Sequence, residues 1–181
     1  MMGAVHRLIR FARDRKGVAA VEFALIAPVL ILIYMGLAEV TMALMADRRA
    51  SHATAVVADL VAQDTLTTRG ELNDLFSIAE EILSPFSPAG MKIRTTAIRA
   101  DANGVPKVVW SHGKGMAAFG KGSTVTGLPA NLMAAYDTLI MSEMTYNYDS
   151  PIKYAIPNAL NFKDTYYLRP RKLEMVNCTD C

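Results

Sequence analysis

The chain has 181 residues, enough for one membrane segment and one modest folded domain but too few for two domains with separate cores. Apolar residues make up 52% of it and the mean hydropathy is +0.21, so their distribution decides the class of protein. The net charge is only +2, and the basic residues behind it gather at one end, which excludes nucleic-acid binding through a basic body.

The first 17 residues form a short basic leader. They contain one acidic residue, Asp14, and five basic ones: Arg7, Arg10, Arg13, Arg15 and Lys16. The leader therefore has a net charge of +4, which leaves −2 for the rest of the chain. Because positive segments beside a membrane span stay on the cytoplasmic side, we predict that residues 1–17 are cytoplasmic and that residues after Val40 are exported.

An apolar run of 21 residues follows, from Val18 to Ala38, with Glu22 as its single charge. As a helix rising about 1.5 Å per residue it would extend roughly 30 Å, the thickness of the hydrocarbon core of a bilayer. The alternative is a buried helix of a soluble protein, but such helices seldom exceed about 14 apolar residues. We therefore predict a transmembrane helix over residues 18–38.

The junction between leader and span, residues 15–23, reads RKGVAAVEF and resembles the processing site of type IV prepilins and pseudopilins. In that family a membrane peptidase cuts on the cytoplasmic side directly after the glycine, and a glutamate is the fifth residue of the mature chain. The resemblance implies a cut between Gly17 and Val18. It also implies that Glu22 acts in helix registration and assembly.

The longer string GVAAVEFALIAP, residues 17–28, resembles in particular the TadE-like pilus-assembly proteins of tight-adherence (Tad/Flp) secretion systems. Weaker similarity continues at residues 144–151 and 167–171. The resemblance implies a minor pilin or pseudopilin, not an enzyme, held in the bacterial inner membrane with its C-terminal domain in the periplasm. The implied partners are membrane lipid, a prepilin peptidase, other pilins or pseudopilins and the Tad pilus assembly machinery.

The chemistry of the two key positions agrees with these roles. Glycine has no side chain, so a protease can approach the backbone at Gly17 closely. A carboxylate in an apolar span is costly, so Glu22 should seek a cation, and the N-terminal amine released by cleavage would supply one. The alternative is that Glu22 only extends toward the lipid headgroups.

Apolar residues beyond the span recur at helical spacing from Val40 to Val61, including Leu44. We expect the helix to continue to about Gln63, so that residues 39–63 form its extracytoplasmic part. Glu39, at the exported edge of the span, is interpreted as a solvated boundary residue.

Residues 64–181 are predicted to form an extracytoplasmic α+β domain. Thr68-x-x-Glu71 is a capping-box pattern, which predicts a second helix that ends near Ser84, before Pro85. Residues 91–100 and 105–111 flank a turn-rich segment and read as a hairpin, while residues 138–148 and 166–169 read as further strands. The predicted fold is a long pilin-like N-terminal helix followed by a small domain with a second helix and an antiparallel sheet.

Both cysteines, Cys178 and Cys181, fall in the last four residues. In an oxidising periplasm they could form a small disulfide loop or pair with another chain. The alternative is two free thiols on a frayed tail. A zinc site needs about four ligands, and the sequence offers no second cysteine pair and no cysteine–histidine cluster.

No cofactor or catalytic set is predicted. Residues 115–121, GMAAFGK, match the opening of a phosphate-binding loop, but Gly122 stands where a serine or threonine is needed to hold magnesium. His6, His52 and His112 are isolated in the sequence, so neither a metal cluster nor a Ser/His/Asp arrangement is proposed. Two functional alternatives stay open: an exported soluble protein released after an ordinary signal sequence, and a membrane-anchored protein with a binding or enzymatic role.

Overall fold

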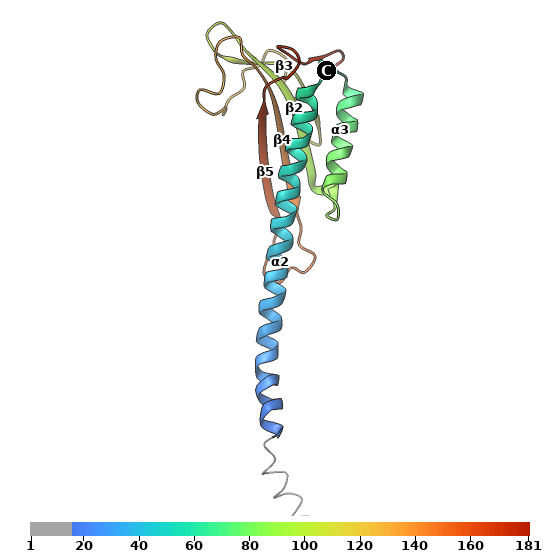
Figure 1. The fold of residues 1–181 in the computed structure, drawn as a ribbon, viewed down its shortest axis with the longest axis vertical. Helices are drawn as coiled ribbons and strands as arrows, with labels where there is room; N and C mark the ends of the chain where they lie inside the picture. The colour runs from blue at the N-terminus through green and yellow to red at the C-terminus, as the bar shows by residue number, and fades with distance from the viewer. Residues whose placement is uncertain (1–15) are drawn as a thin grey trace, which may run out of the picture.

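One helix, α2 (Lys16–Gln63), dominates the molecule and runs without interruption through Pro28. The computed structural model describes residues 16–181, with side chains from Gly17 onward, so most of the predicted leader lies outside the described residues. By length and composition α2 can cross a membrane, and no part of its most apolar stretch is buried by the rest of the chain. Its inner half extends away from the domain, and its outer half is part of the domain (Figure 1).

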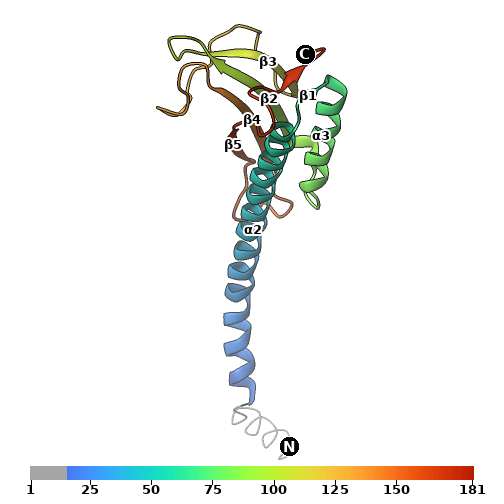
Figure 2. The same cartoon turned by 45° about the horizontal axis from the view of Figure 1, so that its top comes forward.

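The domain combines a second helix, α3 (Arg69–Ile82), with a four-stranded antiparallel sheet. The sheet order is β3-β2-β4-β5, built from β2 (Met91–Ala100), β3 (Pro106–Lys114), β4 (Thr138–Tyr148) and β5 (Leu160–Leu168). The two helices lie on the same face of this sheet (Figure 2). A 3-10 turn, η1 (Pro88–Gly90), precedes β2, and two short strands, β1 (Leu66–Thr67) and β6 (Asn177–Cys178), pair in parallel. The predicted α+β fold is confirmed.

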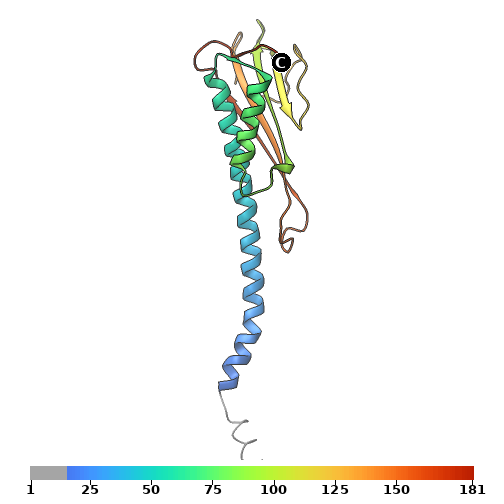
Figure 3. The same ribbon diagram turned by 90° about the vertical axis from the view of Figure 1, so that its right-hand side faces the viewer.

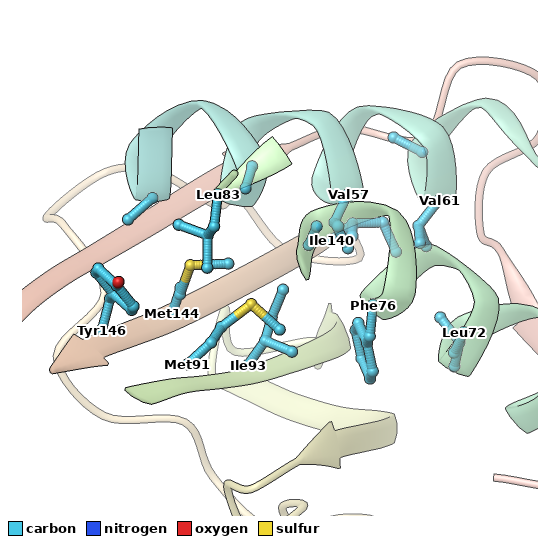
Figure 4. Packing of buried hydrophobic residues seen from close by; sticks show 14 of the residues in the cluster. Val57, Val61, Leu72, Phe76, Leu83, Met91, Ile93, Ile140, Met144 and Tyr146 are labelled. Atoms are coloured by element: carbon cyan, nitrogen blue, oxygen red, sulfur yellow. The ribbon is translucent and has the colours of Figure 1, made fainter. Parts of the chain in front are cut away.

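The main core forms where α2 and α3 pack on β2 and β4. The outer half of α2 presents a buried stripe made mostly of alanine and valine, which lets the backbone of the helix approach the sheet closely. The members of this stripe are Glu39, Ala43, Ala46, Ala50, Ala53, Val57 and Val61. Larger side chains from α3 and the sheet fill the remaining space, among them Phe76, Ile93 and Met144 (Figure 4).

The opposite face of the sheet is covered by the long connection between β3 and β4. Its apolar side chains, including Phe119 and Val125, pack against a second buried cluster around Ile98 and Met141. Arg94 fixes one end of this connection: its guanidinium lies 3.5 Å from the centre of the Phe119 ring and forms an ion pair of 2.7 Å with Glu143. Both faces of the sheet are therefore covered within one chain.

The predicted start of the second helix is confirmed by its cap. The Thr68 hydroxyl accepts a hydrogen bond from the backbone N–H of Glu71, and the Glu71 carboxylate accepts one from the backbone N–H of Thr68. This reciprocal pair satisfies two N–H groups that a helix start otherwise leaves unpaired.

Replacing Thr68 with alanine removes half of this capping box. We expect Thr68→Ala to lower the free energy of unfolding of the domain by about 1 kcal/mol. Urea unfolding of the full chain in detergent, followed by circular dichroism, measures the change. Ser77→Ala is the matched control, because Ser77 is an exposed residue inside the same helix and should leave stability nearly unchanged. Equal losses in both variants would contradict the capping role.

Three expectations differ from the structure. The last strand of the sheet is longer than predicted, since β5 begins at Leu160 rather than near Tyr166. The spacing predicts Val40 and Leu44 on the apolar face of the helix, but both are exposed on its other side. The interpretation of Glu39 as a solvated residue is wrong: its side chain is fully buried against the domain, where it accepts several hydrogen bonds.

Candidate functional site

The predicted processing site lies at the start of α2, at the end of the helix that extends away from the domain. Both Gly17 and Val18 are exposed, and an added Cβ at Gly17 would meet no side chain of the described residues, and no backbone beyond its own helix turn, within 4 Å. From Gly17 onward, the described residues therefore leave this part of α2 open to another molecule. Cleavage between Gly17 and Val18 stays a prediction.

Glu22 lies one turn further along α2, among exposed apolar side chains. Phe23 and Leu25, its neighbours, are each 71% exposed. No ion pair forms at Glu22 among the side chains that the structure describes. A carboxylate on a surface of this apolarity needs a partner outside the described part of the chain, and its role in helix registration stays a prediction.

The exposed apolar surface continues past the predicted outer end of the span. Leu37, Val40 and Leu44 follow one another at helical spacing, and between 44% and 63% of each side chain is exposed. They lie on the side of α2 that faces away from the buried stripe. The domain therefore does not cover this side of α2, and the surface is free to contact lipid or another protein.

Glu39 connects the helix to the segment between β4 and β5, which we call the β4–β5 loop (residues 149–159). Its carboxylate accepts hydrogen bonds from the Ser150 hydroxyl, from the backbone N–H of Ala155 at 2.5 Å and from the backbone N–H of Ile156 at 3.2 Å. Ser150 is buried as well. One carboxylate thus ties together segments more than 110 positions apart in the sequence.

The ionisation of Glu39 reflects these contacts. Burial by itself raises the pKa of this carboxyl, but the hydrogen bonds from Ser150 and from the backbone N–H groups of the loop outweigh it and hold the pKa below the usual value of 4.5. The carboxylate is therefore charged at neutral pH, with its charge stabilised by N–H and O–H donors. It functions as an acceptor for the loop.

Sequence reasoning missed Glu39, although a signal was present. Glu39 precedes Ala43 by four positions and so continues the spacing of the buried stripe toward the membrane. Charged residues are seldom fully buried, and this general tendency favoured the solvated interpretation. Its partners come from residues after β4, which no local pattern around Glu39 indicates.

The C-terminal tail is ordered against the domain, so the alternative of a frayed tail is wrong. β6 pairs with β1, and the carbonyl of the fully buried Val176 accepts a hydrogen bond of 2.7 Å from the indole N–H of Trp110. The Asp180 carboxylate accepts a hydrogen bond of 2.8 Å from the backbone N–H of Arg69 at the start of α3. A carboxylate at a helix N-terminus is favourable because the unpaired N–H groups there carry partial positive charge.

Cys178 and Cys181 are joined by a disulfide in the structure, with Cα atoms 5.6 Å apart. Together with Asp180 they form the one group in residues 16–181 whose His, Cys or carboxylate donor atoms lie close enough to suggest a metal site. Three ligands fall short of a closed structural zinc site, and the disulfide uses both sulfurs. The arrangement suits a small covalent loop on a tail that is already docked.

We expect both cysteines to be oxidised in cells if the domain is exported, because the periplasm favours disulfides. Thiol labelling of intact cells, with and without a reductant, measures this. Labelling should appear only after reduction, and Cys178→Ser should restore labelling of Cys181 without it. Equal labelling of the wild-type protein under both conditions would contradict the prediction.

The loop that resembles a phosphate-binding sequence has another role in the structure. After Lys121 the chain forms a turn and a bridge between Thr124 and Lys107 of β3 rather than a helix. Its Phe119 packs beneath Arg94. His112 stacks on Phe76 and forms a hydrogen bond with Asn73, which makes it a packing residue between β3 and α3.

The geometry fits a class of membrane-anchored proteins: it combines one apolar N-terminal helix, long enough to cross a membrane, with a small α+β domain built on the outer half of that helix (Figures 1 and 3). The family model for TadE-like proteins matches residues 17–59, which confirms the resemblance over that segment. The match includes Gly17, Glu22 and Glu39. It supports a protein associated with a Tad pilus, since TadE-like proteins are pilus components rather than enzymes. Neither a search of curated proteins nor a search of solved structures found a match.

Proposed function

We propose that this chain is a minor pilin or pseudopilin of a Tad/Flp-type pilus. A prepilin peptidase cuts it between Gly17 and Val18, residues 18–38 hold it in the inner membrane, and the domain lies in the periplasm. There it takes part in pilus assembly with other pilins. The observation that carries the proposal is that the segment similar to TadE-like proteins contains the half of α2 that no other part of the domain covers.

The exposed apolar surface supports this role energetically. Apolar surface in water costs about 25 cal/mol per Å², so the inner half of α2 needs lipid or other helices around it. Lipid covers it while the subunit waits in the membrane. During assembly the helices of neighbouring subunits replace the lipid. The exposed apolar surface of Leu37, Val40 and Leu44 extends this contact beyond the span. Glu22 then pairs with the amine released at Val18, on the same or a neighbouring helix.

The structure gives a reason to prefer this function over a soluble exported protein. Release by a signal peptidase would require a cut after the apolar run, near residues 39–46. Glu39, Ala43 and Ala46 lie there, and all three are buried in the domain. A cut at that place would remove part of the core, so the folded domain and the membrane segment are best kept as one chain.

The N-terminus of the membrane-bound protein tests the proposal. Intact mass and N-terminal sequencing should give a chain that begins at Val18. Gly17→Leu should block the cut, because a side chain there obstructs close approach to the backbone, whereas the matched leader variant Gly3→Leu should be cut normally. A wild-type chain that begins at Met1 or beyond Ala38, or protein free in the periplasm after gentle lysis, would contradict the proposal.

A further inference from the structure

The β4–β5 loop reaches from the sheet toward the membrane-spanning half of α2 (Figures 1 and 3). Two contacts fix its position along the helix. Glu39 binds the backbone N–H groups of Ala155 and Ile156, and a Cβ added at Gly36 would lie 3.9 Å from the Ala155 methyl group. The turn of the loop therefore lies beside residues 36–39 of α2, at the outer end of the predicted span.

The composition of this loop is unusual for a connection in water. Residues 151–159 read PIKYAIPNA and contain a single charge, Lys153, which is paired with Asp149 at 2.8 Å. Tyr154 is 52% exposed although it sits among proline, alanine and isoleucine residues. Surface connections are usually polar, because water must satisfy their backbone groups. An apolar loop with its charge neutralised fits an environment that is only partly aqueous.

The position of the loop along α2 agrees with an environment that is only partly aqueous. Gly36 lies 18 positions beyond Val18, which is about 27 Å along a helix and close to the thickness of the hydrocarbon core of a bilayer. Tyr34, on α2 at nearly the same level, is 73% exposed. Tyrosine is enriched where lipid headgroups meet water, because its ring is apolar and its hydroxyl is polar.

We propose that the β4–β5 loop is a second membrane contact, in which Tyr154 rests among the lipid headgroups of the outer face of the inner membrane. The helix alone would leave the domain free to rotate and tilt above the bilayer. Contact through the loop gives the domain a second point of attachment on one side of α2, and Glu39 holds the loop in position to make it. The proposal requires the membrane anchor but neither cleavage at Gly17 nor pilus assembly, so the full uncut chain is suitable for its test.

Tryptophan fluorescence in lipid vesicles tests the contact. The full-length variant Tyr154→Trp is reconstituted in phosphatidylcholine vesicles, with or without lipids brominated near the headgroup, which quench nearby indole rings. Trp110 is the one native tryptophan and is buried in the domain, so it adds the same background to every variant. The emission added by the new tryptophan should fall by roughly one half in brominated vesicles.

The matched control is Tyr136→Trp. Tyr136 is also exposed, at 63%, but it precedes β4 at the opposite end of that strand from the loop, so its emission should not change. Ile152→Trp supplies a second reporter in the loop if Tyr154→Trp fails to fold. Absence of quenching at both loop positions would overturn the proposal, whether water or a second copy of the chain surrounds the loop. Equal quenching at Tyr136 would also overturn it.

Discussion

Glu22→Ala should abolish or severely impair pilus formation while the amount of protein in the membrane stays normal. Alanine removes a costly carboxylate from an apolar span, so insertion should be at least as efficient as in the wild-type protein. What the variant should lose is the proposed ion pair with the amine that cleavage would release at Val18, a contact that would position one helix against the next. Immunoblots of membranes measure the amount of protein in the membrane. Counts of surface pili by electron microscopy measure pilus formation.

Two variants separate this effect from a general disturbance of the helix. Val21→Ala shortens the neighbouring side chain, which is 60% exposed, and should leave pili intact. Glu22→Asp keeps the carboxylate and should retain part of the assembly. Normal pilus counts in Glu22→Ala would show that the carboxylate has no role in assembly. Loss of the protein from the membrane would instead contradict the expected ease of insertion.

The parts of the fold that depend on local signals could be predicted from the sequence. The apolar run and the periodicity after it indicate α2, and the capping box at Thr68 indicates the start of α3, because both signals act within a few residues. The sequence predicts β4 over its observed range, Thr138–Tyr148, since Ile140, Met144, Tyr146 and Tyr148 alternate along the face that packs on the helices. These elements need only their own sequence to be recognised.

The parts that depend on distant contacts could not be predicted in the same way. The first half of β5 contains Lys163 and Asp164, which hide the alternation of an edge strand, and pairing with β4 from Leu160 onward extends it. The docking of the C-terminal tail rests on β1 and Trp110, from other parts of the chain. The candidate processing site is the opposite case, because its pattern is read entirely within residues 15–23.

Glu39 depends on both local signals and distant contacts. Its place in the buried stripe follows from the local spacing, whereas its partners come from a distant part of the chain. Glu39→Ala leaves the Ser150 hydroxyl and the N–H groups of Ala155 and Ile156 without their acceptor. Donors that are buried, as at Ser150, or partly buried, as at Ala155 and Ile156, are unfavourable when unpaired, so the β4–β5 loop should detach from the helix much more often. We expect trypsin to cut after Lys153 roughly tenfold faster or more in the detergent-solubilised chain, because cleavage requires a locally opened backbone.

Asp149→Ala is the matched control for this experiment. It breaks the exposed pair with Lys153 but keeps every contact of Glu39, so its cleavage rate should remain near that of the wild-type protein.

Acid provides an independent test, with an acid-active protease in place of trypsin. Because the folded pKa of Glu39 lies below its ordinary value, the contribution of this carboxylate to docking is complete above about pH 4.5 and is lost as the pH falls through the folded pKa. Loop cleavage in the wild-type protein should therefore rise only in that acidic range, while Glu39→Ala should be cut rapidly at every pH. Similar rates in Glu39→Ala and the wild-type protein at neutral pH would mean that the loop is held by its apolar residues instead.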